Sequence, residues 1–280
     1  MTDNAPTEPT DALLAELLDL ALEAGRRAGV LLRDGRPHDL SVARTKSSPI
    51  DVVTEMDLAA EKLITGFLAD HRPDDGFLGE EGAASPGTSG VRWVVDPLDG
   101  TVNYLYGLPT WAVSIAAEVG GETVVGVVEA PMRGETYRAV RGGGAYMRAG
   151  DGGQWRPLAA RPAPPLDQAL VSTGFNYVQT VRSHQADVAQ RLIPQLRDIR
   201  RSGSAAIDLS DVAAGRLDGY YERGLSPWDL AAGDLIAREA GALTGGRPGE
   251  RPSGELAVAA SSGVFEPLQA LLEEYGAWHD

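Results

Sequence analysis

The segment from Trp93 to Asn103 constrains this chain more than any other. Its first residues are apolar and predict a buried strand, which ends abruptly in Asp96 and Asp99. Pro97 fixes the backbone between these acids, and Gly100 permits a tight turn after them. Two carboxylates this close need a cation beside them, or one of them has to keep its proton. Because a short loop with only oxygen ligands suits a hard cation such as Mg²⁺, the segment predicts either a metal site or an ordinary turn.

The composition limits the chemistry that is open to the chain. Its 280 residues make one large domain or two halves, and the hydrophobic share of 43% is enough for a sizeable core. A net charge of −15 disfavours nucleic acid as a partner, and it suits an anionic substrate only where metal ions reverse the local field. Because the sequence contains no cysteine, disulfides, thiolate nucleophiles and iron–sulfur clusters are excluded.

Neither a targeting signal nor a membrane span is visible. Residues 1–10 are polar and acidic, unlike a secretory signal, and no apolar run approaches the ~18 residues of a span. We therefore expect a soluble, cytoplasmic protein that does not engage a membrane. The histidines are not spaced as metal ligands, and we expect surface positions rather than catalytic roles for all four, which are His38, His71, His184 and His279.

The spacing of apolar residues divides the chain into two regions. The first begins with two helices, over 11–33 and from about 54 to 72, and continues with strands at 77–78, 91–95, 112–119, 123–129 and 136–140. A stretch rich in Gly, Pro and Arg follows at 150–165 and is the best candidate for a junction. Beyond it, strands at 169–172, 219–222 and 256–260 alternate with helices at 184–197, 203–215, 228–241 and 265–275.

This order of elements predicts an α+β fold. We expect helices and sheets to stack as a layered α-β-α-β-α sandwich, because each helix and each sheet has an apolar face to cover. The sheet of the N-terminal half should be antiparallel and that of the C-terminal half mixed. We place the border between two subdomains, residues 1–155 and 156–280.

Four other segments carry acids or helix starts in suggestive places, and each also has an ordinary structural explanation. Thr54 and Asp57 have the spacing of a capping box. Glu80 and Glu81 follow a predicted strand, where a cation or solvent has to separate their like charges. Asp229 falls at a helix start and suits an N-cap.

The fourth segment is Gly203–Ala206, which is a helix start made of small residues. The N–H groups of such a start form a seat for an anion, or they belong to a helix that is simply well capped.

Taken in order along the chain, these segments resemble the signature of the inositol monophosphatase family. The resemblance runs from about Lys46 to about Ala242. Lys46–Pro49 and the Thr54/Asp57 pair are similar to the family's lysine-containing loop and its first acidic element. The segments that resemble its remaining motifs are Gly79–Glu81, Asp96–Tyr104 and Trp228–Gly233, followed by Glu239–Gly241.

The resemblance implies a phosphatase that uses two or three Mg²⁺ ions and an activated water. The residues implied to hold the ions are Glu80, Asp96, the main-chain carbonyl of Leu98, Asp99 and Asp229, with Asp57 reaching a third, weaker ion. Asp57 and Thr101 are implied to orient the attacking water, with Glu80 counted beside them as a catalytic residue. Those implied to bind the substrate are Asp99, Gly100, Thr101, Gly203, Ser204, Ala205, Glu222 and Asp229.

The resemblance leaves the substrate less certain than the reaction. The stretches Arg200–Leu209 and Gly219–Glu222 look most like those of enzymes acting on inositol monophosphate. In that family the acid at Glu222 accepts hydrogen bonds from ring hydroxyls, but a carboxylate also suits the amine of histidinol phosphate. That ester stays an alternative, together with sugar and nucleotide phosphates. Phe175–Tyr177 and Arg182 either line the pocket entrance or form a surface loop.

A non-enzymatic reading also stays open, because some bacterial relatives have a role in transcription complexes. A protein that only binds a partner has no reason to keep the whole acid set, however. The resemblance further implies a homodimer and inhibition by Li⁺.

Overall fold

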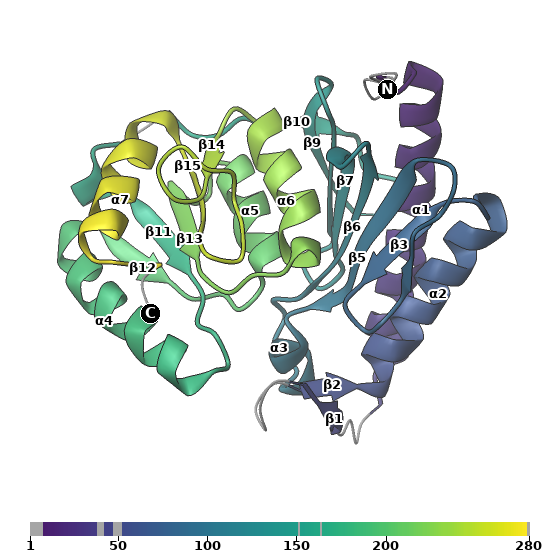
Figure 1. Ribbon diagram of the computed structural model, residues 1–280, viewed down its shortest axis with the longest axis horizontal. Helices are drawn as coiled ribbons and strands as arrows, with labels where there is room; N and C mark the ends of the chain where they lie inside the picture. The colour runs from purple at the N-terminus through teal and green to yellow at the C-terminus, as the bar shows by residue number, and fades with distance from the viewer. Residues whose placement is uncertain (1–7, 38–41, 47–51, 151, 163, 279–280) are drawn as a thin grey trace, which may run out of the picture.

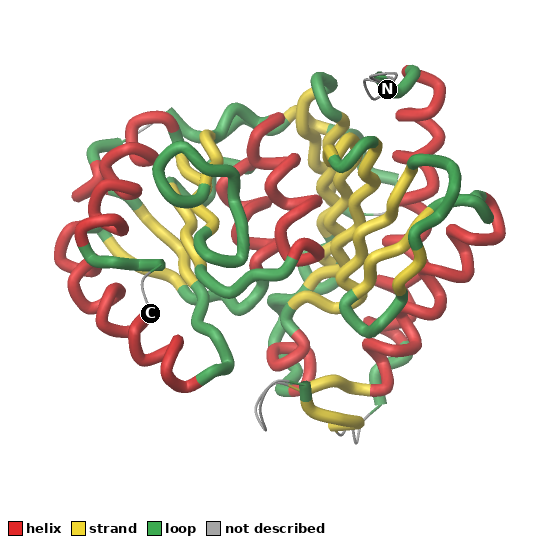
Figure 2. The backbone as a smooth tube through the Cα atoms, viewed as in Figure 1, coloured by secondary structure: helices red, strands yellow, loops and turns green. Residues whose placement is uncertain are grey.

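The computed structural model describes residues 8–37, 42–46, 52–150, 152–162 and 164–278. Its elements stack in the order helix, sheet, helix, sheet, helix (Figures 1 and 2). The predicted layered sandwich is therefore confirmed. No helix in the described ranges is long and apolar enough to cross a membrane.

Two long helices, α1 (Asp11–Asp34) and α2 (Glu55–His71), form the first layer. The Oγ1 atom of Thr10 accepts the N–H of Leu13 and so caps α1, which ends at Gly35 as the sequence predicts. Leucine and alanine side chains of both helices pack on one face of the first sheet, where Trp93 is fully buried.

The first sheet holds eight strands in the described part of the chain, in the order β10-β9-β8-β7-β6-β5-β3-β4. They are β3 (Gly76–Gly79), β4 (Ala84–Ser85), β5 (Val91–Asp99), β6 (Ala112–Val119), β7 (Glu122–Ala130), β8 (Glu135–Val140), β9 (Gly144–Ala149) and β10 (Arg156–Pro157). All neighbours pair antiparallel except β3 and β5, which run parallel. That parallel pair brings the ends of β3 and β5 to the same edge, where both carry acids.

The third layer consists of α5 (Ala205–Ala213) and α6 (Pro227–Glu239), which lie between the two sheets (Figure 1). The second sheet is mixed, with the order β12-β11-β13-β15-β14. Its strands are β11 (Leu170–Thr173), β12 (Asp198–Arg200), β13 (Gly219–Glu222), β14 (Leu243–Gly245) and β15 (Ala257–Ala260). The last layer consists of α4 (Gln179–Leu192) and α7 (Ser262–Glu274).

Five short elements complete the description: the paired strands β1 (Val42–Thr45) and β2 (Val52–Thr54), α3 (Thr101–Leu105) directly after β5, and the 3₁₀ turns η1 (Leu166–Gln168) and η2 (Ile193–Gln195). Separate hydrophobic clusters fill the spaces between successive layers. Each layer is thus held by its own apolar contacts.

The helix predicted at 184–197 is wrong at both ends, because α4 covers Gln179–Leu192. It begins early because the Asn176 side chain accepts the N–H of Val178 and turns the chain into the helix. It ends early because Pro194, in the turn η2, has no N–H with which to continue the helix. The short strands β12 and β14 were not predicted, since each has only three residues and too few of them are apolar to show a period.

Candidate active site

A β-bulge at the end of β5 sets the direction of its two aspartates. Asp96 pairs with Ser114 of β6 and Asp99 pairs with Ala112, so three steps along β5 match two along β6. Residues three apart in a regular strand face opposite sides of a sheet, and one extra residue removes that alternation. Both aspartates consequently line the same cavity.

Asp57 serves two structural purposes with its two oxygens. Its Oδ2 accepts the backbone N–H of Thr54 at 2.9 Å, which is half of the capping box that starts α2. Its Oδ1 lies 2.9 Å from Oγ1 of Thr101, and the same hydroxyl is 3.1 Å from the carbonyl oxygen of Leu98. The capping interpretation is therefore correct, and the acid also contacts the motif at the end of β5.

Asp99 joins the first sheet to the start of α5. Its Oδ2 accepts the hydroxyl of Ser204 and the N–H of Ala206, both at 2.7 Å. The anion held at this helix start is thus a carboxylate of the chain itself, while Ser204 also caps the helix by accepting the N–H of Ile207.

Asp229 and Glu80 reach the same place from α6 and from the turn after β3. The prediction that Asp229 is the N-cap of α6 is wrong, because Asp229 lies three residues after the N-cap. Its Oδ2 accepts the N–H of Ser226, which is the N-cap, at 2.6 Å. Oε1 of Glu80 lies 2.7 Å from the ammonium of Lys46, which also pairs with Glu81.

These residues surround one cavity of about 390 Å³. Its lining brings together all the predicted site residues except Asp57, which lies behind Thr101: Glu80, Asp96, Leu98, Asp99, Gly100, Thr101, Gly203, Ser204, Ala205, Glu222 and Asp229. Neither His71 nor His184 is among the lining residues. Each instead contacts a backbone carbonyl, at Phe67 and at Gly276.

Burial and mutual repulsion disfavour the charged forms of the acids. Burial raises the pKa of Asp57 and that of Asp99 to about 6. For Asp96, burial and then the charge of Glu80 raise the pKa well above its ordinary value. Burial and then the charge of Asp99 do the same to the pKa of Asp229. A site of this kind gains stability from any positive charge placed between its carboxylates.

The chemistry of the donors fits Mg²⁺. They are carboxylate oxygens and one backbone carbonyl, the hard ligands that this ion prefers. Within the described residues no three acidic or histidine side chains are already arranged as a metal-binding group. The reason is local, because Glu80 pairs with Lys46, while Asp99 and Asp229 each accept a backbone N–H. An ion bound at Oε1 of Glu80 would compete with Lys46 for that oxygen.

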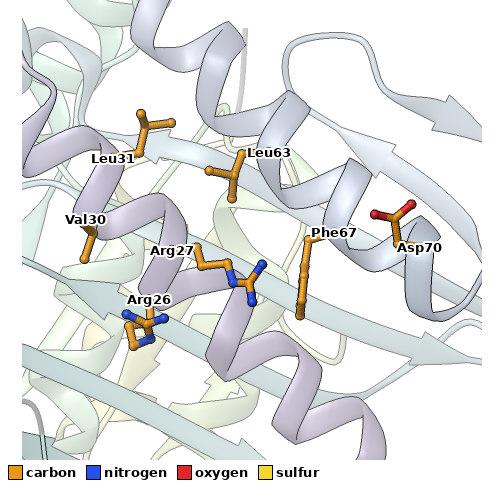
Figure 3. A pocket seen from close by; sticks show the side chains of 7 residues that line it. All are labelled: Arg26, Arg27, Val30, Leu31, Leu63, Phe67 and Asp70. Carbon is orange, nitrogen blue, oxygen red and sulfur yellow. The ribbon is translucent and has the colours of Figure 1, made fainter.

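A second hollow, of about 500 Å³, lies on the outer face of α1 and α2 (Figure 3). There the Arg27 guanidinium stacks 4.4 Å from the centre of the Phe67 ring. Its lining contains a single acid, Asp70. It therefore lacks the group of converging acids that marks the first cavity.

The sequence left part of the cavity wall open, because no motif marks the loop after β11. Phe175–Tyr177 line the cavity, so the pocket alternative holds for them, whereas Arg182 is not among the lining residues. Arg201, to which the sequence assigned no role, also lines the cavity. The predictions for Ser47–Pro49, His38 and His279 concern positions outside the described residues.

Comparisons with known proteins place the chain in a class of phosphatases. A model of the inositol monophosphatase family matches residues 13–277. The inositol-1-monophosphatase SuhB of Mycobacterium tuberculosis is 44% identical over 269 residues, which cover 92% of each chain. The Nus factor SuhB of Escherichia coli is 40% identical over 229 residues, which cover 81% of this chain and 84% of that protein.

A solved structure agrees with these sequence matches. The structure of Mycobacterium tuberculosis SuhB has a TM-score of 0.79 and 40% identity, and the match covers 95% of this chain and 98% of that one. The chain therefore belongs to the inositol monophosphatase family. Phosphatases of this family generally depend on metal ions such as Mg²⁺.

Proposed function

We propose that this protein hydrolyses inositol 1-phosphate with the help of two or three Mg²⁺ ions. The observation that carries the proposal is the convergence of Glu80, Asp96, Asp99 and Asp229 on one cavity from three separate parts of the fold. We assign the ions to these acids and to the carbonyl of Leu98. The names of its relatives in Mycobacterium also support the choice of substrate.

The ions would supply positive charge that lowers the pKa of bound water and neutralises the phosphate. The hydroxyl of Thr101, which lines the cavity, donates to Asp57 and keeps its lone pairs to accept a hydrogen bond from the attacking water. The water oxygen bonds to phosphorus as the ester P–O bond breaks, and the departing alcohol takes a proton that the water loses. Histidine is not needed for these steps.

The two ends of the substrate would be held by different elements. We assign the phosphate to backbone N–H groups of Gly100 and Thr101, where Gly100 has φ 98° at the start of α3. The alcohol would lie against Gly203, Ser204 and Ala205 at the start of α5, and against Glu222.

The surroundings of Glu222 favour a neutral polyol over a cationic amine. Its Oε2 accepts the hydroxyl of Tyr220 at 2.8 Å, and burial raises its pKa to about 7. The guanidinium of Arg201 lines the same cavity and acts on Glu222 as a positive charge. A second cation, such as the amine of histidinol phosphate, would be repelled by it.

A kinetic comparison tests the proposal. Release of phosphate is measured for inositol 1-phosphate, histidinol phosphate, fructose 1,6-bisphosphate and phosphoadenosine phosphate, with Mg²⁺ and with EDTA. We expect turnover to require Mg²⁺, to be inhibited by Li⁺, and to have its highest kcat/KM with inositol 1-phosphate. Turnover in EDTA would contradict the metal mechanism, and a preference for histidinol phosphate would contradict the substrate.

The name of the relative in Escherichia coli supports a second candidate role, in transcription complexes. We expect this role to accompany catalysis, because the acid set is complete. A pull-down from native lysate that recovers RNA polymerase subunits would support it, and their absence would count against it. We also propose a homodimer, as the family resemblance implies, which light scattering of the purified protein would test.

A further inference from the structure

We infer that Glu61 is a positioning residue, whose carboxylate fixes the turn that carries Glu80. The inference rests on the proposed function, since it concerns how a proposed metal ligand is held. Glu61 belongs to none of the motifs in the sequence and does not line the cavity. Its side chain is nonetheless buried, with the residue only 7% exposed.

The carboxylate of Glu61 binds the backbone of the turn at two points. Its Oε2 accepts the N–H of Glu81 at 2.8 Å, and its Oε1 accepts the N–H of Ala83 at 3.0 Å. Both oxygens are therefore used, and the residues they hold lie one and three positions after Glu80, the acid proposed as a ligand. A buried carboxylate with two N–H donors is a stronger anchor than a neutral acceptor would be.

The turn is shaped to receive this side chain. The N–H of Gly79 donates to the carbonyl of Ala83 at 2.7 Å and closes the turn, and the N–H of Glu80 donates to the carbonyl of Val95 in β5 at 3.2 Å. A Cβ at position 79 would collide with Oε2 of Glu61. Because glycine has no Cβ, the carboxylate can approach the backbone of the turn closely.

Glu61 also relates two parts of the proposed site to each other. It follows Asp57 by four residues in α2, so both acids lie on the same side of that helix. Asp57 contacts Thr101, while Glu61 contacts the turn of Glu80. One helix thus sets the distance between the proposed water-orienting pair and a proposed metal ligand.

Two cations also contact this turn. Lys46 pairs with the carboxylates of Glu80 and Glu81, so it competes with any ion that Glu80 would hold. Arg44 is exposed, pairs with the carboxylate of Glu81 and donates to its carbonyl oxygen. Glu61 is buried and holds the backbone N–H groups of the turn without engaging the Glu80 side chain. Residues that orient a metal's ligands in this way typically change metal affinity by about 10- to 100-fold when they are replaced.

The test measures Mg²⁺ binding by calorimetry in the absence of substrate, together with thermal unfolding in EDTA. Glu61→Gln keeps the shape but places an NH₂ group against one of the two backbone donors. Glu61→Asp keeps the charge but is too short to reach both. Glu135→Gln is the matched control, because Glu135 is also largely buried and pairs with Arg216 outside the cavity.

We expect the Kd for Mg²⁺ to rise about 10- to 100-fold in Glu61→Gln and to rise in Glu61→Asp, while Glu135→Gln binds as the wild type does. The activity of Glu61→Gln should recover at high Mg²⁺ with an unchanged KM for inositol 1-phosphate, which a general loss of structure would not allow. If Glu61→Gln does not fold, Glu61→Asp decides the matter. A folded Glu61 variant with the wild-type Kd overturns the inference alone, whereas a wild type without Mg²⁺ affinity overturns the proposed metal centre.

Discussion

At the scale of single residues, the candidate site is a group of acids whose structural and proposed chemical roles coincide. Asp57 and Asp229 each occupy the third position of a helix and accept an N–H from the residue that caps it. Each therefore has one oxygen engaged by the backbone, which fixes the direction of the carboxylate. The alternatives that the sequence offered, a cap or a functional acid, are compatible in this fold.

Asp229 and Asp234 allow a matched test on one helix. In Asp229→Asn an oxygen can still accept the N–H of Ser226, so we expect the fold to survive while kcat falls by about 100-fold or more through loss of a ligand charge. Asp234→Asn only removes a pair with Arg238 at 2.9 Å, and its kcat should match that of the wild type. Phosphate release at saturating Mg²⁺ and thermal unfolding of both variants decide the matter. Equal activities would show that Asp229 is not a ligand.

At the scale of elements, the end of β5 and the start of α3 form the part of the fold that the site depends on most. The bulge turns Asp96 and Asp99 to one side, and Gly100 then reverses the chain with a positive φ. Gly100 is also packed closely, since a Cβ there would lie 2.9 Å from the carbonyl oxygen of Thr110. Conformation and space both require glycine at this point.

A pair of glycine replacements separates these two requirements. Gly121 in the β6–β7 hairpin has φ 83° with nothing within 4 Å of a Cβ, so Gly121→Ala should cost about 1–2 kcal/mol from conformation alone. Gly100→Ala adds crowding, and its loss in unfolding free energy should be larger by at least about 1 kcal/mol. Urea unfolding of the two variants gives both values. Equal losses would mean that the packing around Gly100 gives way without cost.

At the scale of the whole molecule, the packing of two sheets and three helix layers brings together acids that are far apart in the sequence. The Ser204–Asp99 contact joins positions 105 apart, and with the neighbouring acids it concentrates negative charge between the sheets. The net charge of −15 is therefore partly a property of this site. The division at residue 155 stays a prediction, while the first sheet continues to β10 at Arg156–Pro157.

That concentration of charge predicts a coupled effect of pH and metal. Because the pKa of Asp57 and of Asp99 rises from 3.8 to about 6, the native state binds protons more tightly than the unfolded state. The stability this gives is present below pH 3.8 and is lost as pH rises through 6, so these groups make the metal-free protein less stable at neutral pH. Mg²⁺ binds the ionised carboxylates, so the stabilisation that it gives should increase as the pH rises.

The measurement is the Tm in EDTA and in Mg²⁺, near pH 5 and near pH 7.5, with KCl as a control for ionic strength. At a Mg²⁺ concentration of about 100 Kd, stabilisation should approach about 2.7 kcal/mol at the higher pH and be smaller at the lower one. Equal stabilisation at both values would mean that the ion does not bind these acids.

The sequence predicted the fold well where local signals are strong. Thr10 and Gly35 bound α1 as expected, and the strand predicted at 219–222 is β13 with the same bounds. The acids of the site were recognisable from their motifs, but their convergence depends on how layers pack. Glu61 shows what the sequence could not predict. A single glutamate on a helix suggests a solvent-exposed residue, and only the structure shows the turn that it holds.

The central claim is that Glu80, Asp96, Asp99 and Asp229 share one cluster of divalent ions. Anomalous diffraction from a crystal grown with Mn²⁺ tests it most directly. We predict anomalous peaks inside the cavity, about 2.0–2.2 Å from oxygens of these four residues, with Glu80 turned away from Lys46. Peaks only at other places, with the Lys46–Glu80 pair intact, would contradict it.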